Sequence, residues 1–406
     1  MERLIRKYAE KLIRAKLGEE SGPSQPLVGG LDDVLVWNRE APECDVLEKV
    51  FQKMSMNSLV FLRPAEPYKT VIRHLAEQAL DSGGRILPRD CETRTFLHDL
   101  PVIDTFSPEA IIEILKQRKS VIISCAGEEE IGPAVVAHGS VSPEQGFVTV
   151  SSVCFAAFVA FFSDYLEALQ TKQVQPAHHA VFDRVLPFLE PSRPPSCEWI
   201  SFPFADEKTV YSAIVQAGKA VVEHGLVDSY FGNVSYLWQS TLYISQTGSS
   251  LDELEHCIDP VPLDFSTSAG LTASSELSAH LETVFRTGCR AILHGHPRFC
   301  VILSMDCDPA RKAVCAFRDQ CHLRCPDKRF AGTTPIVPGE VGTGPTGLCH
   351  TLPAALETVD NAIVYGHGLF ATARQDFSHA FSVLWSVEQA CQARYLEKVS
   401  DLRQTY

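Results

Sequence analysis

The stretch "AILHGHPRFCVIL", residues 291–303, places two histidines, His294 and His296, in an otherwise apolar run. Its composition is that of a buried strand, in which residues i and i+2 point to the same face. Both imidazoles therefore share one side of the strand, and Gly295 turns to the other. Two neutral imidazoles on one face are typical ligands of a divalent transition metal. Two histidines hydrogen-bonded in a core would give the same pattern, so the pair alone leaves both interpretations open.

Three segments elsewhere in the chain add candidates. "YGHGLF", residues 365–370, places His367 after another short apolar strand and between two glycines, which let backbone come close to a bound group. "YFGNVS" (230–235) and "YISQTGSS" (243–250) are turns rich in glycine, hydroxyl and amide groups, and either could be an ordinary hairpin turn.

A helix is expected to begin near Glu276. In "LTASSELSAHLETVF", residues 271–285, apolar side chains recur at helical spacing. Ser274 or Ser275 is expected to cap this helix, with Glu276 in its first turn. A helix start with hydroxyl side chains and free N–H groups also favours an anion such as phosphate. His280, one turn later, is interpreted as structural.

Composition limits the class of protein. The chain has 406 residues, 45% of them hydrophobic, and a formal charge of −14. The charge argues against nucleic acid or an anionic membrane as the main partner. No signal peptide is visible, and the apolar run 153–162 is too short to span a bilayer, so it predicts a buried helix. The cysteines form no CxxC pair, which indicates reduced thiols and a cytoplasmic protein.

The two halves of the chain echo each other. "LEKVF" (47–51) recurs as "LETVF" (281–285), and "SLVFLRP" (58–64) recurs as "AILHGHP" (291–297). The His-Gly pair at His138 resembles the one at His367. We infer a duplication. The predicted organisation is a domain at 1–170, a proline-rich linker at 171–200 and a second domain at 201–406.

Secondary-structure patterning in the second half alternates. Strand-like runs at 241–245, 291–293 and 362–365 alternate with helical segments at 210–223, 276–287 and 377–399. This alternation predicts an α/β fold with a central sheet flanked by helices.

Taken together, the motifs of residues 205–400 resemble the class II aldolase/adducin family, in the order in which that family carries them. The resemblance implies a three-layer α/β fold with a mainly antiparallel central sheet, present twice, the first copy being degenerate. It implies the catalytic carboxylate Glu276 and the metal ligands His294, His296 and His367 for Zn²⁺ or another divalent transition metal. It also implies a grip on the substrate phosphate formed by Gly232, Asn233, Thr247, Gly248, Ser274 and Ser275.

The implied function is that of a zinc-dependent aldehyde-lyase of carbohydrate metabolism. Such an aldolase cleaves or forms a C–C bond in a phosphorylated ketose through a metal-stabilised enediolate. The alternatives are a sugar-phosphate 4-epimerase or dehydratase on the same site, or a non-catalytic adducin-like interaction module. The resemblance also implies a homo-oligomer, either a tetramer or a dimer whose fused copies make it pseudo-tetrameric. A small sugar phosphate is the expected partner.

Two departures from the family pattern stand out. Segment 321–343 has no tyrosine to serve as the family's proton donor, although Phe330 lies there; the tail residue Tyr406 is a candidate. In the first half, Leu62 and Arg63 stand where the histidine pair is expected, and the His138 echo has no partner histidines. Glu43 falls close to where the acid would lie. We therefore expect residues 1–170 to lack a metal site.

Overall fold

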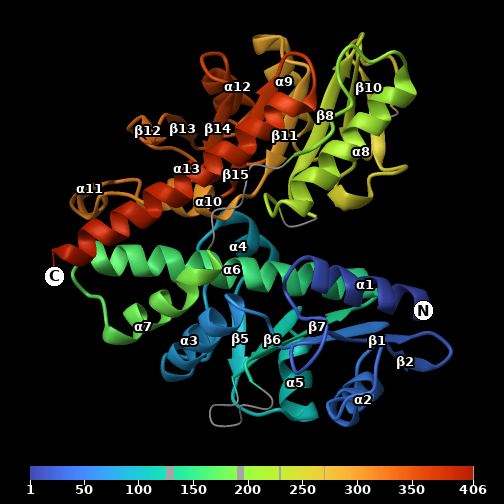
Figure 1. Cartoon of the computed structure of the whole chain (residues 1–406), viewed down its shortest axis with the longest axis vertical. Helices are drawn as coiled ribbons and strands as arrows, with labels where there is room; N and C mark the ends of the chain where they lie inside the picture. The colour runs from blue at the N-terminus through green and yellow to red at the C-terminus, as the bar shows by residue number, and fades with distance from the viewer. Residues whose placement is uncertain (125–131, 190–195, 228–229, 269, 406) are drawn as a thin grey trace. The chain divides into compact units, whose positions relative to one another are not determined.

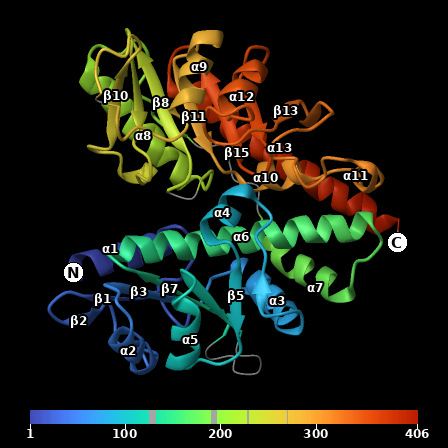
Figure 2. The same ribbon diagram turned by 180° about the vertical axis from the view of Figure 1, so that it is seen from behind.

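The computed structural model describes residues 1–124, 132–189, 196–227, 230–268 and 270–405, which form two compact units (Figures 1 and 2). The first unit comprises Met1–Tyr165 and Val174–Glu190, and the second comprises Leu166–Gln173 and Pro191–Tyr406. Each unit is a mixed α/β structure built on one sheet. The predicted domain limits at 170 and 201 stay predictions.

The second unit holds an eight-stranded sheet in the order β10-β9-β8-β11-β15-β14-β13-β12. Neighbouring strands are antiparallel except for β13 and β14, which are parallel. The sheet is therefore mainly antiparallel, as expected. Its strands are β8 Asn233–Trp238, β9 Thr241–Ser245, β10 Ile258–Pro262, β11 Ala291–Gly295, β12 Arg329–Ala331, β13 Thr334–Val337, β14 Asn361–Val364 and β15 Gly368–Ala373.

Helices cover both faces of this sheet. Successive residues of β11 point to opposite faces, so their contacts show which helices lie on each side. Ile292 packs in one apolar cluster with side chains of α9 and α12, whereas Gly295 faces Leu384 of α13. His294 shares the face of Ile292. The helices of this unit are α8 Glu207–Glu223, η2 Leu251–Glu253, α9 Leu277–Thr287, α10 Arg298–Met305, α11 Pro309–Val314, α12 Leu348–Leu356 and α13 Phe377–Gln404.

The first unit holds a seven-stranded sheet in the order β2-β1-β3-β7-β6-β5-β4. Its elements, together with the long helix that leads into the second unit, are α1 Glu2–Arg14, β1 Leu27–Leu31, β2 Leu35–Trp37, α2 Cys44–Lys53, β3 Ser58–Leu62, α3 Tyr68–Asp81, β4 Arg85–Ile86, α4 Cys91–Leu97, β5 Leu100–Ile103, α5 Pro108–Leu115, β6 Ser120–Ile123, β7 Ala134–Gly139, α6 Pro143–Gln170, α7 Pro176–Val185 and η1 Leu186–Phe188.

The two sheets have the same topology. The order β2-β1-β3-β7-β6-β5-β4 in the first sheet corresponds strand by strand to β9-β8-β11-β15-β14-β13-β12 in the second. Each pair of neighbouring strands runs in the same relative direction in both sheets. The one parallel pair of the first sheet, β5 and β6, corresponds to the one parallel pair of the second, β13 and β14. The second sheet adds only the edge strand β10. A 28-residue helix follows each sheet's last central strand, α6 after β7 and α13 after β15. This shared order supports the duplication inferred from the sequence.

Strand register corrects the detailed alignment of the two halves. Strands β3 (Ser58–Leu62) and β11 (Ala291–Gly295) each have five residues, and matching their ends places Phe61, which pairs with Val136, at the position of His294, which pairs with Phe370. The residues that match His294 and His296 are therefore Phe61 and Arg63, and the expected match of Leu62 to a histidine is wrong.

The predicted echo between His138 and His367 is also wrong. His138 pairs with Leu59, as Thr372 pairs with Ile292, so His138 matches Thr372 near the far end of the strand. The residue before β7 that matches His367 is Pro133. Pairing register is fixed by the pleat of the strands, whereas a His-Gly dipeptide recurs by chance.

Helix α6 contains the apolar run 153–162. It is long and apolar enough to cross a membrane, yet 89% of its most apolar window is buried within the protein. Side chains such as Phe158 and Phe162 pack in this buried surface. The expectation of a buried helix is therefore confirmed for this segment. Part of the predicted linker 171–200 is helical, since it contains α7, Pro176–Val185. Proline is well suited to the first turn of a helix, where its missing N–H is not needed.

Candidate metal centre

Three histidines from separate segments meet in the second unit. His294 lies in β11, His296 follows that strand, and His367 precedes β15. The Nε2 atom of His294 lies 3.1 Å from that of His296 and 3.3 Å from that of His367. All three ligand atoms lie within 4.8 Å of one another, and all three side chains are buried. Adjacent antiparallel strands β11 and β15 bring the pair and the third histidine together.

The spacing of these nitrogens fits a tetrahedral metal ion. Nitrogens about 2.0–2.1 Å from a tetrahedral zinc lie about 3.4 Å apart, close to the two short separations found here. Burial lowers the pKa of His294 and of His296 well below the usual value, and each is lowered further by a neighbouring histidine. Both rings are therefore neutral at physiological pH. Neutral imidazoles can bind a cation without first losing a proton.

Hydrogen bonding and stacking fix the ring of His294. The backbone oxygen of Leu369 lies 3.1 Å from its Nδ1 atom, so Nδ1 donates and Nε2 is left as the acceptor that faces the other histidines. The ring of Phe370 stacks on it at a centroid distance of 3.9 Å. Phe231 stacks on His296 in the same way, at 5.5 Å.

Glycines let the backbone approach the histidines closely. A Cβ atom at Gly368 would lie 2.4 Å from the oxygen of Gly295 and 2.7 Å from Cε1 of His294. A Cβ at Gly232, whose φ is +83°, would lie 2.4 Å from the oxygen of His294. Only glycine fits either position without displacing β11.

Glu276 lies directly beside the histidines. Its Oε2 atom is 3.5 Å from Nε2 of His294, and its Oε1 atom is 3.5 Å from Nε2 of His367. The side chain is 4% exposed. A carboxylate here can act as a further ligand or as an acid–base group for a substrate held at the same place.

The start of α9 differs from its prediction. Glu276 itself is the N-cap residue of α9, which begins at Leu277, so neither Ser274 nor Ser275 caps the helix. The Ser274 hydroxyl instead accepts a hydrogen bond of 3.3 Å from the backbone N–H of Glu276. This bond tightens the turn that aims the carboxylate at the histidines.

A buried chain of hydrogen bonds leads away from Glu276. Asn233 donates from Nδ2 to Oε2 of Glu276 at 2.5 Å, and its Oδ1 atom lies 2.5 Å from Nε2 of His280. The Nδ1 atom of His280 lies 2.7 Å from the hydroxyl of Ser235. We call Ser235, His280 and Asn233 the relay. Sequence reasoning treated His280 as structural, and its position one turn after Glu276 is the only signal that linked it to the site.

The structure brings two of the predicted phosphate segments side by side. The N–H of Thr247 donates to the oxygen of Thr272, and the N–H of Ser274 donates to the oxygen of Ser245. Thr247, Gly248 and Ser275 are exposed. The side chain of Asn233, by contrast, is turned to Glu276 and His280.

The matching place in the first unit holds a different set of side chains. Glu43 is the N-cap of α2, as Glu276 is of α9, and its carboxylate forms an ion pair with Arg63. Arg63 stands at the position of His296, so a guanidinium supplies positive charge beside the carboxylate. Among the described residues, the only group of three or more potential metal ligands is the one formed by the three histidines.

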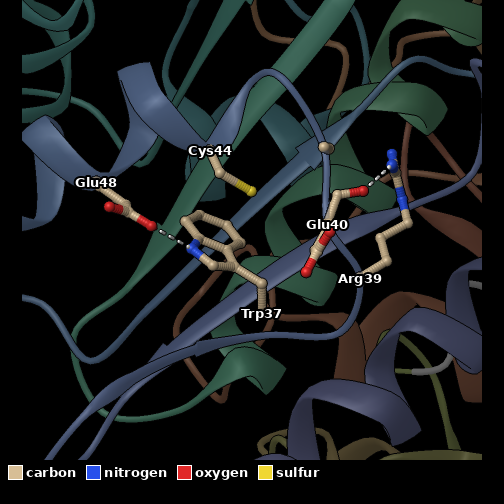
Figure 3. A pocket seen from close by; sticks show the side chains of 6 residues that line it. Trp37, Arg39, Glu40, Cys44 and Glu48 are labelled. Atoms are coloured by element: carbon tan, nitrogen blue, oxygen red, sulfur yellow. Dashed lines mark hydrogen bonds between the residues drawn. The ribbon is translucent and has the colours of Figure 1, made fainter.

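A hollow in the first unit lies at another place, beside β2 and the start of α2 (Figure 3). It is lined by Trp37, Arg39, Glu40, Ala41, Cys44 and Glu48. Trp37 Nε1 donates to Oε1 of Glu48 at 3.3 Å. Burial raises the pKa of the Cys44 thiol, which stays protonated and is a poor nucleophile. We assign no chemistry to this hollow.

The candidate proton donor Tyr406 lies outside the described residues. Segment 321–343 contains β12 and β13, and Phe330 in β12 is exposed. A phenyl ring cannot donate a proton, and segment 321–343 contains no tyrosine that could take this role beside Glu276.

Comparison with known proteins finds a family profile that matches part of the second unit. Residues 212–395 match the profile of the Class II Aldolase and Adducin N-terminal domain. A comparison with curated protein sequences found no match. The family profile spans most of α8 through most of α13, and so it includes every strand of the second sheet.

Several solved structures are similar to part of the chain. The L-fuculose-1-phosphate aldolase from Thermus thermophilus is 22% identical, and the alignment covers 47% of this chain and 95% of that one, with a TM-score of 0.38. The sugar-phosphate aldolase from Thermotoga maritima is 18% identical over 47% of this chain and 96% of that one, with a TM-score of 0.34. The L-fuculose 1-phosphate aldolase from Glaciozyma antarctica is 13% identical over 50% of this chain and 78% of that one, with a TM-score of 0.31.

Proposed function

We propose that this protein is a zinc-dependent aldehyde-lyase that acts on a phosphorylated ketose, in keeping with the match of residues 212–395 to the class II aldolase and adducin profile. The observation that carries the proposal is the convergence of three buried imidazole nitrogens beside the carboxylate of Glu276. An adducin-like interaction module would need no such set. Burying four polar side chains costs free energy unless a ligand or a network compensates it.

His294, His296 and His367 would hold the metal ion through Nε2. A zinc ion bound by three histidines acts as a Lewis acid toward the carbonyl and adjacent hydroxyl oxygens of a ketose. His294 keeps its orientation through the backbone oxygen of Leu369 and the stacked ring of Phe370, and His296 through the stacked ring of Phe231. These contacts hold two of the three imidazoles in place without a ligand, which is what pre-organisation of a catalytic site requires.

Glu276 would move the proton at the reacting carbon. In the cleavage direction, the C4 hydroxyl would give its proton to the Glu276 carboxylate, the C3–C4 bond would break and an aldehyde would leave. The bonding electron pair stays on the C2–C3 fragment as an enediolate. Protonated Glu276 then gives its proton to C3, which yields dihydroxyacetone phosphate from a ketose 1-phosphate. In the synthetic direction, the Glu276 carboxylate removes the same proton.

We place the substrate phosphate at the turn of Thr247 and Gly248 and at Ser274 and Ser275, near the backbone of Gly232. Hydroxyl and backbone N–H groups at such turns bind phosphate oxygens. Binding energy gained here would position the reacting carbon without touching it. Free thiols at the described cysteines support a reducing, cytoplasmic location. We also keep a homo-oligomer as part of the proposal.

Metal analysis and substrate screening test the proposal. We expect about one zinc per purified chain in the wild type and none in a His294→Ala/His296→Ala variant. Release of aldehyde from a panel of ketose 1-phosphates, beginning with L-fuculose 1-phosphate, should occur in the wild type. Glu276→Gln should keep the metal and lose about 100-fold or more in rate. Full metal content in the double histidine variant would exclude this centre.

Product analysis separates the lyase from a 4-epimerase, the second candidate, which the lack of a tyrosine in 321–343 favours. An epimerase would return a ketose phosphate of inverted configuration and release no free aldehyde. A dehydratase would release water instead and give a dicarbonyl or enol product. Two measurements on one sample distinguish the three reactions. An NADH-dependent dehydrogenase reduces and so detects any released aldehyde, and proton NMR follows the sugar phosphate.

A further inference from the structure

We propose that His280 is a positioning residue, which through Asn233 holds the carboxylate of Glu276 in the orientation its proton transfer requires. This inference rests on the proposed function for its kinetic consequence and on geometry for its structural part. It assigns the side chain of Asn233 to the carboxylate and not to the substrate phosphate.

The hydrogen-bond directions in the relay follow from the donor and acceptor capacity of each group. An ionised Glu276 carboxylate only accepts, so the amide of Asn233 must present Nδ2 to it. A reversed amide would set Oδ1 against a carboxylate oxygen with no proton between them. Oδ1 of Asn233 therefore faces His280 and needs a donor.

This direction fixes the tautomer of His280. Its Nε2 atom carries the proton and donates to Asn233, which leaves Nδ1 to accept from the hydroxyl of Ser235. The ring is 1% exposed, and burial lowers its pKa to about 3. A neutral ring with both nitrogens paired cannot rotate without breaking two hydrogen bonds, so it acts as a rigid support.

The relay lies wholly out of solvent. Ser235 is 0% exposed, and Asn233 and Glu276 are each 4% exposed. Water cannot replace a lost partner in such a place without rearrangement. Because Asn233 begins β8, next to the histidine strand β11, the relay ties the orientation of the carboxylate to the same sheet that carries His294.

The first unit provides an internal comparison. Register matches Asn233 to Leu27 and Ser235 to Gly29, because Leu27 pairs with Phe61 as Asn233 pairs with His294. Four residues after the N-cap, Leu47 stands where α9 has His280. Leu27 and Leu47 pack in one apolar cluster.

The same fold is therefore stable with two leucines and a glycine in place of the relay. Fold maintenance alone does not require these three polar side chains. In the unit without ligand histidines the relay residues are replaced, and the carboxylate of Glu43 turns to Arg63 instead. The relay is found in the unit that has the three histidines and not in the unit that lacks them, as expected if its role is to orient Glu276 beside those histidines.

A spectroscopic experiment on the metal-free full-length chain tests the structural part. Nitrogen-15 NMR of the histidine-labelled protein, with His280 assigned by its disappearance in His280→Gln, should show a neutral ring protonated at Nε2. The short bond to Glu276 should move the Asn233 side-chain amide protons downfield. In His280→Leu this shift should be lost, and in His280→Gln it should persist, because the glutamine amide can donate to Asn233.

Kinetics on the zinc-loaded chain tests the functional part. The probe is exchange of the C3 proton of dihydroxyacetone phosphate with deuterium. His280→Leu should keep its zinc content and its KM within about twofold and lose about 100-fold in kcat, since small misplacements of a catalytic group cost rates of this order. His280→Gln should recover at least about tenfold of that loss.

Each contrary result has a distinct meaning. A ring protonated at Nδ1, or a His280→Leu variant whose KM rises while kcat is unchanged, would overturn the proposal and return Asn233 to the phosphate. Should His280→Leu fail to fold, the tautomer and the His280→Gln kinetics still decide. A wild type that binds zinc but exchanges no proton, with the expected tautomer and Asn233 shift, would refute the proposed lyase while leaving the relay in place.

Discussion

At the scale of single residues, the candidate centre depends on Gly368, which lets the start of β15 lie close to β11. Gly368 stands between β14 and the histidine strand, with the oxygen of Gly295 and the rings of His294 and His296 around the place of its missing side chain. A methyl group there must displace either β11 or an imidazole. Ligand distances tolerate only about 0.2 Å before a metal site weakens.

Gly368→Ala is therefore expected to weaken zinc binding by about 10- to 100-fold, in the range seen when groups that orient ligands are removed. Competition with a fluorescent chelator measures the affinity. Gly344→Ala is the matched control, because a Cβ atom at Gly344 meets nothing within 4 Å. Unchanged affinity in the Gly368 variant would show that the histidines do not share one ion.

The histidine pair was predictable because the two-residue repeat of a strand puts His294 and His296 on one face whatever the fold. The partners of Asn233 were not. Its amide meets a carboxylate 43 positions away and an imidazole 47 positions away. No local pattern encodes such a meeting, since it depends on how α9 packs against β8. The sequence offered a turn with a polar amide, which suits a phosphate equally well.

At the scale of elements, helices α3 and α7 of the first unit meet through histidines. The ring of His74 on α3 lies 5.1 Å from that of His178 on α7 and 5.8 Å from Phe161. Burial, together with the nearby His178, lowers the pKa of His74 to about 4. Its Nε2 atom has no hydrogen-bond partner among the described residues, so a proton on it would be buried without compensation.

Stability of this helix pair should fall in acid. Between pH 6.5 and 4 the unfolded chain binds a proton at His74 that the folded chain does not, so the free energy of unfolding decreases as the pH falls below about 6.5. The expected loss is about 1.5 kcal/mol between about pH 6.5 and pH 5. Denaturant unfolding at both pH values measures it.

His74→Gln should remove this part of the pH dependence, because glutamine does not titrate. His350→Gln, which changes an exposed histidine on α12, should leave the dependence as in the wild type. Equal pH dependence in the wild type and in His74→Gln would mean that His74 is protonated without cost in the fold.

Element boundaries followed from sequence where periodicity was strong and failed where a cap was decided by geometry. The strand 241–245 and the start of the helix at Phe377 were predicted at their observed positions. The α9 cap was not, because serine is a strong cap former on average, yet here its hydroxyl serves the turn before the helix. That turn is held by the backbone bonds that join Thr247 and Ser274 to neighbouring segments.

At the scale of the whole molecule, one chain carries two copies of a fold and a single histidine cluster within the described residues. In the first copy, Arg63 and Glu43 are 15% and 10% exposed at their side chains, so their ion pair is largely out of solvent. Removing one partner leaves the other charge poorly solvated, whereas removing both does not.

Arg63→Met is therefore expected to lower the stability of the first unit by about 2 kcal/mol, and Arg63→Met/Glu43→Gln should recover most of that loss. Thermal unfolding of the full-length variants measures both. Under the proposed function, zinc content should stay at about one ion per chain in each variant, since the three candidate ligands lie in the second unit. A second zinc equivalent bound near Glu43 in any variant would contradict the assignment of the first copy.

The duplication itself was visible in short matches, because apolar strands and the following prolines keep their spacing. Its exact alignment was not, since two His-Gly dipeptides suggested an offset that the strand pairing excludes. Register is a property of two strands together. A single strand read alone cannot reveal which partner residue it faces.

The shared strand order of the two sheets bears on how this chain folds during synthesis. Tandem units with one topology can exchange strands, so that an element of one completes the sheet of the other and the chain is trapped or aggregates. The contrast between "SLVFLRP" and "AILHGHP" makes such an exchange unfavourable, because imidazoles would be buried against leucines. A chimera with two near-identical halves should refold in lower yield than the natural chain, so divergence between the copies protects the nascent protein from misassembly.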